Sequence, residues 1–96
     1  MVRQGDFEWD PAKAAANFRK HKVSFPEAAT VFLDPGVVIE PDHVHSADEL
    51  RATAIGFSAL SRVLLVVHTE RGERIRLISA RKATPEERRR YESQID

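Results

Sequence analysis

Three segments rich in β-branched and aliphatic residues, separated only by short turns, constrain the fold of this chain most strongly. They run from Arg51 to Ser58, from Arg62 to Thr69 and from Arg74 to Ala80. Gly72 lies in the second turn and can supply the positive φ that tight hairpins require. Because strands joined by so few residues run antiparallel, these segments predict a three-stranded antiparallel meander.

The first half of the chain carries helix signals. A short strand is expected over residues 6–9, and Asp10-Pro11 then indicates a helix start, because Asp can cap the free amides and Pro fits the first turn. Ser24 and Glu27 have the spacing of a capping box. The apolar residues around them recur at helical spacing and predict one continuous stripe on a second helix: Phe25, Ala28, Ala29, Phe32 and Leu33.

The remaining signals complete the domain. Residues 37–39 are β-branched and predict a further strand, whereas the acidic stretch Glu40–Glu49 is expected to be a loop. A capping box and a Pro in the first turn open a last helix at Thr84. The element order predicts an α+β fold in one domain over residues 1–96, with an antiparallel sheet, two N-terminal helices on one face and a C-terminal helix.

Composition excludes several classes of protein. With 96 residues and 42% apolar content, the chain supports one modest core. The absence of Cys excludes disulfides, thiolate zinc sites and a Cys nucleophile. The longest apolar run, Val63–Val67, is far shorter than the roughly 20 residues of a membrane-spanning helix, so no membrane partner is expected. Acidic residues near the N-terminus replace the apolar stretch of a signal peptide, which favours a cytoplasmic protein.

The net charge of zero hides an asymmetry between the two halves of the chain. Residues 1–50 contain 5 bases and 9 acids, whereas residues 51–96 contain 10 bases and 6 acids. A basic half is what a polyanionic partner such as a nucleic acid requires. Alternatively, the two halves attract each other within one soluble fold, and the charge alone does not separate these interpretations.

Two-residue turns would set the register of both hairpins and thereby the two faces of the sheet. Residue 66 would then lie opposite residues 55 and 77. One face would collect the bulky apolar side chains that meet the helical pair: Ile55, Phe57, Leu64, Val66, Ile75 and Leu77. A one-residue bulge would exchange the faces, because side chains alternate along a strand.

The opposite face would combine small residues of the first hairpin strand with Arg74 and Arg76 of the last one. Such a face forms a shallow trough, and the planar guanidinium groups suit phosphate oxygens. Alternatively, the C-terminal helix fills the trough, and its Glu86 or Glu87 pairs with the two arginines. The trough is therefore a candidate binding surface with a structural alternative.

Several polar residues are candidates for acid–base chemistry. Lys20 and His21 end the first helix, where they can act as a base or a phosphate anchor, or only stabilise the helix end. His68 and Glu70 lie near the tip of the second hairpin, where either can act as an acid or base beside Arg76. His68 alternatively projects from the edge of the core. The segment from Asp42 to His45 resembles a metal-binding loop only in composition, so no metal site is predicted.

Motifs spread along the chain resemble the signature of the BrnT toxin family. The resemblance extends from Phe7 to Tyr91. It is carried by Phe7-Glu8-Trp9-Asp10, Lys13, Asn17, Lys20-His21, Val23-Ser24-Phe25, Glu27-Ala28, Val31-Phe32, Asp34-Pro35, Arg51, Ile55-Gly56, Thr69-Glu70-Arg71-Gly72, Ile75-Arg76, Ile78-Ser79-Ala80-Arg81, Ala83, Glu87-Arg88 and Tyr91. Lys22 departs from the family pattern, in which a Gly is expected after the Lys-His pair.

The resemblance implies a ribonuclease toxin of a type II toxin–antitoxin system, with a fold similar to the RelE toxins. Such a toxin cleaves RNA and thereby inhibits translation, with no metal or other cofactor. Its partner would be a BrnA-like antitoxin that forms a hetero-oligomer with it and represses the shared promoter, so that DNA is contacted only through this complex. The alternative is a non-catalytic interaction module whose basic strand and C-terminal helix bind an acidic partner.

If the chain cleaves RNA, the chemistry of that reaction indicates which residues are candidates for acting on it. The 2′-hydroxyl of RNA can serve as the nucleophile, so the protein has to supply a base, an acid and positive charge for the transition state. The catalytic candidates are two arginines for charge stabilisation and three residues for proton transfer: Arg76, Arg81, His21, Glu70 and Lys20. The candidates for holding the RNA backbone are Arg51, Arg74 and Lys82.

Overall fold

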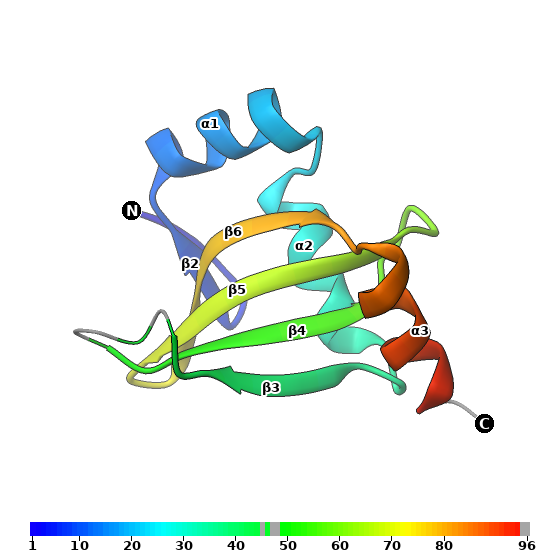
Figure 1. The fold of residues 1–96 in the computed structure, drawn as a ribbon. Coiled ribbons are helices and arrows are strands. Elements are labelled where there is room, and N and C mark those ends of the chain that lie inside the picture. Colours follow the sequence, from blue (N-terminus) through cyan, green and yellow to red (C-terminus); the bar gives the residue numbers. More distant parts are fainter. Residues whose placement is uncertain (45, 47–48, 95–96) are drawn as a thin grey trace.

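The computed structural model describes residues 1–44, 46 and 49–94, which form a sheet of six strands with three α-helices and one 3₁₀ turn, η1 (Figure 1). In chain order the elements are β1 (Val2–Gln4), β2 (Phe7–Trp9), α1 (Pro11–His21), α2 (Phe25–Thr30), η1 (Val31–Leu33), β3 (Val38–Asp42), β4 (Arg51–Phe57), β5 (Val63–Arg71), β6 (Arg74–Lys82) and α3 (Pro85–Ser93). The α+β class predicted from the sequence is confirmed.

The strands lie in the order β1-β2-β6-β5-β4-β3, so the N-terminal strands join the sheet beside its last strand. Every neighbouring pair is antiparallel except β2 and β6, which run parallel. This pair corrects the expectation of a purely antiparallel sheet. It brings together residues 68 positions apart, Glu8 and Arg76, and no local pattern encodes such a contact.

Part of the acidic stretch that was expected to be a loop is a strand. β3 continues through Glu40 to Asp42 and pairs along its whole length with β4. Because β3 is an edge strand, the missing N–H of Pro41 is tolerated there. Acidic residues on an edge strand also discourage pairing with other chains.

The turn between β4 and β5 contains three residues rather than two. Ser58 donates its backbone N–H to the carbonyl of Arg62 at 2.8 Å, and Ser61 adopts a left-handed conformation with a φ of 63°. This geometry is typical of a three-residue hairpin loop. Val66 therefore pairs with Ala54 instead of residue 55, and the predicted faces of β4 are exchanged.

The exchange sends the small residues of β4 toward α2 and η1 and its bulky residues toward α3. A Cβ on Gly56 would lie 2.8 Å from Val31 Cγ1, so η1 approaches β4 very closely at this position. Ile55 packs on the other face with Tyr91 of α3. The predicted trough of small residues beside the arginines of β6 is therefore wrong.

The second hairpin is also shifted from its predicted register. Its turn consists of Gly72 and Glu73, and Val66 lies opposite Ala80 rather than residue 77. A β-bulge lies further along β6, where Val67 pairs with Ser79 and His68 with Leu77. Ile78 consequently has no partner on β5. This extra residue shifts the alternation of side chains, so that Arg81 shares a face with Arg76.

Helices cover the two faces of the sheet unequally, and Figure 1 shows α2 and α3 on opposite sides. α2 and η1 supply the larger core with Phe25, Ala28 and Val31, which pack on Leu64 and Val66 of β5. On the other side, α3 covers only one end of the sheet. The helical stripe predicted as continuous is interrupted, because α2 ends at Thr30 and η1 follows it, which leaves Leu33 80% exposed.

One buried side chain holds α1 against the free edge of β6. Asn17 donates from Nδ2 to the carbonyls of Val23 and Ala80, both at 2.9 Å, and its Oδ1 accepts from the N–H of Ala80 at 3.0 Å. β2 pairs with β6 only at residues 75 and 76, so Asn17 satisfies backbone groups that would otherwise lack a partner strand. Lys20 and His21 follow Asn17 at the end of α1.

Among the residues that the structure describes, no helix is long and apolar enough to span a membrane.

Candidate functional site

A row of polar and charged side chains crosses the sheet on the face away from α2. The register places its members side by side on five neighbouring strands, in the order Glu8, Arg76, Thr69, Arg51 and Asp42. We call this set the polar row. Neighbouring strands lie about 4.8 Å apart, so the Cα atoms of Arg76 and Arg51, two strands apart, are about 10 Å from each other.

Glu8 fixes the position of Arg76 in this row. Arg76 donates from Nε to the Glu8 carboxylate at 2.8 Å and from its terminal nitrogen at 2.5 Å. The hydrogen bond from Arg76 is the main reason why the pKa of Glu8 is lowered, and it outweighs the opposing effect of burial. Glu8 is therefore ionised at neutral pH. The pair holds one guanidinium group in a defined orientation on the sheet.

Arg51 is held more loosely than Arg76. Its Nε lies 3.6 Å from a carboxylate oxygen of Glu49, beyond hydrogen-bonding distance, and it has no hydrogen-bond partner within the described part of the chain. The backbone around it is fixed, because Thr69 donates its hydroxyl to the carbonyl of Leu50 and Ser46 accepts from the N–H of Arg51. The guanidinium group of Arg51 is therefore held only by a loose ion pair with Glu49.

Arg81 lies on the same face, at the end of the sheet that α3 covers. It donates to both carboxylate oxygens of Glu87, at 2.8 and 2.9 Å. These hydrogen bonds lower the pKa of Glu87 to about 2. Glu87 also accepts from the N–H of Thr84 as part of the capping box that starts α3. One carboxylate thus caps the helix and joins it to β6.

A hollow of about 520 Å³ lies on this face between β3, α3 and the middle of the sheet. Its floor includes Thr53 and Val67, and Arg81 and Arg90 lie at its α3 side. Arg90 reaches across to Glu40 of β3 at 3.1 Å. The polar row and this hollow together make the α3 face the concave, partly charged side of the sheet.

The remaining basic candidates are spread over the molecule. Arg74 shares the face of Arg76, but its guanidinium donates to the carbonyl of Gly5 at 2.6 Å and thereby supports the turn between β1 and β2. Lys82 pairs with Leu64 and so points from the strand toward the α2 face. The expected pairing of Arg74 and Arg76 with Glu86 or Glu87 is wrong, because Glu8 and Gly5 supply their partners.

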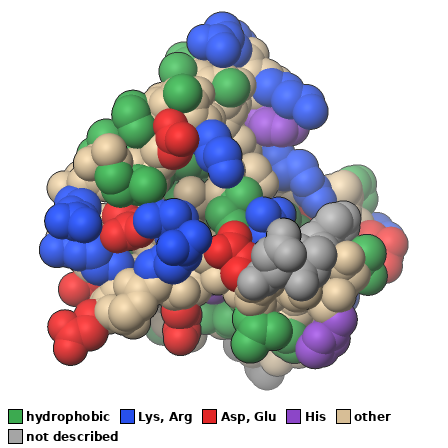
Figure 2. Space-filling model, turned by 90° about the vertical axis from the view of Figure 1, so that its left-hand side faces the viewer, with side chains coloured by type: hydrophobic (Ala, Val, Ile, Leu, Met, Phe, Trp, Pro, Cys, Tyr) green, Lys and Arg blue, Asp and Glu red, His purple; other side chains and the backbone are tan. Residues whose placement is uncertain are grey.

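Lys20 and His21 lie at the end of α1, beside the part of β6 that β2 leaves unpaired. Neither side chain has an ion-pair partner among the described residues. Residues 11–26 contain basic residues and no Asp or Glu. Figure 2 shows Lys and Arg side chains at the top of the molecule, over α1, with an acidic side chain below them. This end of α1 is a second basic surface, distinct from the polar row.

Glu70 and His68 do not accompany Arg76. Both point to the α2 face, because side chains alternate along β5 and Thr69 belongs to the polar row. The prediction that either residue acts beside Arg76 is therefore wrong for this arrangement. His68 is 6% exposed, and burial lowers its pKa, so its imidazole is neutral at physiological pH.

The loop with metal-like composition adds no cluster of ligands. His43 is exposed, and His45 lies outside the described residues. Within the described ranges, no group of three or more His, Asp or Glu side chains is arranged to hold a metal ion.

Two residues of the polar row, Glu8 and Thr69, were not predicted from the sequence. Glu8 belongs to a matched motif, but its role depends on the parallel pairing of β2 with β6, which has no local signal. Thr69 alternates with apolar neighbours in a strand and gives no hint that it separates two arginines. The alternation in β5 could have placed Thr69 on a polar face only after the hairpin register was known.

Comparisons with known proteins give a consistent picture. A family model described as "Ribonuclease toxin, BrnT, of type II toxin-antitoxin system" matches residues 9–87. The crystal structure of the Brucella abortus ribonuclease toxin BrnT is similar with a TM-score of 0.64 and 22% sequence identity, over 81% of this chain and 95% of that chain. No curated protein sequence matches the chain. The structural similarity, at this identity, concerns the fold.

Proposed function

This chain belongs to the BrnT family of ribonuclease toxins of type II toxin–antitoxin systems, and from this premise we propose that it is a metal-independent endoribonuclease that acts at the polar row. The observation that carries the proposal is the presence of two guanidinium groups, Arg76 and Arg51, on one sheet face with only Thr69 between them. Guanidinium groups bind phosphate oxygens through paired N–H donors. An RNA backbone laid across the strands would meet both.

In the proposed reaction, the 2′-hydroxyl oxygen of the RNA attacks the adjacent phosphorus. The bond from phosphorus to the 5′-oxygen of the next nucleotide breaks, which yields a 2′,3′-cyclic phosphate and a free 5′-hydroxyl. A base removes the proton of the 2′-hydroxyl, and an acid protonates the leaving oxygen. Such acid–base help accelerates reactions by roughly 10²–10⁴-fold, and fixed positive charge stabilises the extra negative charge on the phosphorus oxygens.

The residues divide among these tasks according to their position. Arg76, oriented by Glu8, stabilises the developing charge, and Arg51 holds the neighbouring part of the backbone. Arg81 lies further along the same face and extends the binding surface toward α3. Lys20 and His21 remain candidates for proton transfer. They lie together beside the open edge of β6, on a surface separate from the polar row, so this role requires the RNA to extend from one surface to the other. Glu70 is left out of this set, since it faces the other side of the sheet.

Membership of the family implies an antitoxin partner and an RNA substrate. We propose that the antitoxin is BrnA-like, that it forms a hetero-oligomer with this chain, and that contact with DNA occurs only through that complex. A relationship to the RelE toxins, with inhibition of translation as the outcome, is part of the same proposal.

The test compares three forms of the purified, antitoxin-free protein on a labelled RNA. Glu8→Gln keeps the charge of Arg76, whereas Glu8→Gln combined with Arg76→Gln replaces the ion pair by a neutral hydrogen-bonded pair of similar size. We expect the single variant to retain cleavage and the double variant to lose at least about 100-fold of it. Arg88→Gln, an exposed position on α3, is the matched control.

Circular dichroism and thermal unfolding establish that each variant is folded. Full cleavage by the folded double variant would remove Arg76 from the reaction. A folded wild-type protein that leaves every RNA intact would contradict the proposed activity and favour the non-catalytic interaction module. A product that ends in a 2′,3′-cyclic phosphate indicates attack by the 2′-hydroxyl, whereas attack by water leaves an open phosphate monoester.

A further inference from the structure

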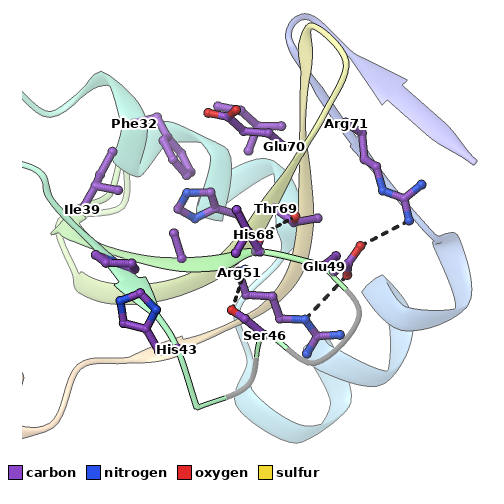
Figure 3. A pocket seen from close by; sticks show the side chains of 14 residues that line it. Phe32, Ile39, His43, Ser46, Glu49, Arg51, His68, Thr69, Glu70 and Arg71 are labelled. Atoms are coloured by element: carbon purple, nitrogen blue, oxygen red, sulfur yellow. Dashed lines mark hydrogen bonds and ion pairs between the residues drawn. The ribbon is translucent and has the colours of Figure 1, made fainter.

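A cavity of about 860 Å³ lies on the sheet face opposite the polar row, at the end where β3, β4 and β5 approach η1. Figure 3 shows its lining from close by. Most of the wall is apolar and includes Phe32, Ile39, Ala52 and Ile75. A concave, largely apolar site with a few polar groups is typical of small-ligand binding. Of the lining residues, Arg51 and Thr69 also belong to the polar row.

His68 is the polar group in the centre of this lining. Its ring lies edge-on to Phe32, with the centroids 4.9 Å apart and the planes at 84°. Its Nδ1 is buried and has no well-aligned hydrogen-bond partner in the described part of the chain, although a backbone contact with Val66 opposes the lowering of the His68 pKa. Because burial lowers the pKa of His68, the ring is neutral and offers one N–H donor and one nitrogen acceptor. A buried polar atom without a partner is costly, which points to a ligand.

The chemistry of the wall distinguishes between two kinds of occupant. An aliphatic side chain from a partner protein would fill the apolar space but leave the imidazole of His68 unsatisfied. A nitrogen heterocycle presents flat apolar faces to Phe32 and Ile39 and a hydrogen-bonding edge to His68. Stacking and edge recognition of this kind are how proteins hold single unpaired bases. The observations therefore favour a base over an aliphatic side chain.

The mouth of the cavity adds charges of both signs. Glu49 lies between Arg51 and Arg71, 3.6 Å from the first and 3.3 Å from the second. One carboxylate therefore serves two guanidinium groups, which leaves positive charge for a phosphate. Arg51 is also a member of the polar row, so the cavity opens beside the surface proposed to hold the RNA backbone.

Glu70 lines the same cavity two residues after His68 and on the same face of β5. The two groups are close enough for the charge of Glu70 to oppose the lowering of the His68 pKa. Glu70 is exposed at the rim of the cavity, and its carboxylate accepts hydrogen bonds and donates none when ionised. It would accept from an exocyclic amino group and would repel a carbonyl oxygen at the same position.

We propose that this cavity is a base-binding subsite that takes one unpaired nucleobase with an exocyclic amino group, recognised by His68 and Glu70, from an RNA whose backbone passes Arg51. The inference rests on the proposed function for the origin of the base. It assigns the cavity a role in choosing where RNA is bound, separate from the groups that break the bond.

The test measures binding of single nucleotides to the full chain by NMR titration. CMP carries an amino group where UMP carries a carbonyl, and ribose 5-phosphate lacks the base. We expect CMP to perturb the His68 ring and to bind about tenfold more tightly than UMP, as one hydrogen bond to a charged group provides. Ribose 5-phosphate is expected not to perturb the His68 ring.

Two variants test the location of the site. Ala52→Leu fills the cavity and is expected to abolish CMP binding, whereas Ala59→Leu, in the exposed turn between β4 and β5, retains it. Glu70→Ala changes an exposed side chain, and it is expected to remove the preference for CMP over UMP. Equal binding of CMP and UMP by the wild type, or unchanged CMP binding by Ala52→Leu, would overturn the inference.

Failure of this inference is distinguishable from failure of the proposed function. RNA cleavage by a chain that does not bind CMP would leave the ribonuclease activity standing and refute the subsite. CMP binding by a chain that cleaves no RNA would support the subsite and refute the activity. If Ala52→Leu prevents capture of the co-expressed antitoxin and CMP does not bind to the wild type, the cavity is a protein-docking site instead.

Discussion

At the scale of single residues, the end of α1 carries backbone strain that a small change would relieve. Lys22 caps the helix with a φ of 59° and donates its N–H to the carbonyl of Phe18 at 2.9 Å. The left-handed conformation costs a non-Gly residue about 1–2 kcal/mol. The resemblance to the BrnT family predicts a Gly at this position, and a φ of 59° is one that Gly adopts without strain.

We therefore expect Lys22→Gly to stabilise the protein by about 0.5–1 kcal/mol, since part of the relieved strain is offset by the greater entropy of Gly in the unfolded chain. The measurement is the free energy of unfolding from urea titration. Lys20→Gly, two residues earlier and in a normal helical conformation, is the matched control and should destabilise by about 1 kcal/mol. Equal effects of both substitutions would contradict the interpretation of strain at Lys22.

At the scale of elements, the capping signals predicted the helix starts correctly, whereas the turn signals predicted the strand register wrongly. The starts of all three helices follow from Asp10, Ser24 and Thr84, because a cap is a local arrangement of a side chain with amides two or three residues away. The predicted register of β4 was wrong by one residue. The left-handed residue of the turn is Ser61, and without a Gly there the sequence does not indicate a three-residue turn.

The candidate site was predicted correctly in its residue types and wrongly in its geometry, for the same reasons. Arg76 and Arg51 were identified by their chemistry, but their alignment depends on the registers that the turn at Gly72-Glu73 and the three-residue turn set. The bulge at Ile78 brings Arg81 to the same face. Glu8 reaches Arg76 through the parallel pairing of β2, and Glu70 was expected beside Arg76 although the two side chains point to opposite faces of the sheet. Sequence patterns therefore gave the residue types of the site and not their arrangement.

The attachment of α3 to the sheet predicts a dependence on pH. The pKa of Glu87 is about 2 in the folded chain, below its ordinary value of 4.5, chiefly because of the hydrogen bonds from Arg81. A lowered folded pKa contributes stability above the unfolded pKa, and this contribution is lost as the pH falls from about 4.5 toward 2. Because solvent reaches part of the pair, we expect it to be worth about 1 kcal/mol.

The measurement compares the free energy of unfolding at pH 6 and pH 3 for the wild type and for Glu87→Gln. The wild type should lose more stability on acidification than the variant, by about 1 kcal/mol. Glu92→Gln, on an exposed part of the same helix, should behave like the wild type. A pH dependence that Glu87→Gln leaves unchanged would show that other carboxylates account for it.

At the scale of the whole molecule, the opposite charges of the two halves meet inside the fold. Glu8 pairs with Arg76, Glu27 with Arg62, Glu49 with Arg71 and Glu40 with Arg90, and each pair joins residues 1–50 to residues 51–96. Much of the basic character of the second half is thus neutralised by the first. The interpretation of charge asymmetry as internal attraction is therefore supported, and it leaves the end of α1 as a basic surface.

This distribution determines how the binding of RNA should respond to salt. Each phosphate neutralised by a base releases counterions, and the slope of log affinity against log salt changes by about 0.7 for each contact with single-stranded RNA. Lys20→Ala, which removes an unpaired charge, should lower the magnitude of the slope by about 0.7. Arg88→Ala, whose partner Glu92 lies 3.8 Å away, should leave it unchanged. For both variants, the affinity for a non-cleavable 2′-O-methyl oligonucleotide is measured between 50 and 200 mM salt, roughly the range over which such slopes are resolved. An unaltered slope for Lys20→Ala would mean that RNA does not approach the end of α1, and proton transfer would then have to come from the sheet itself.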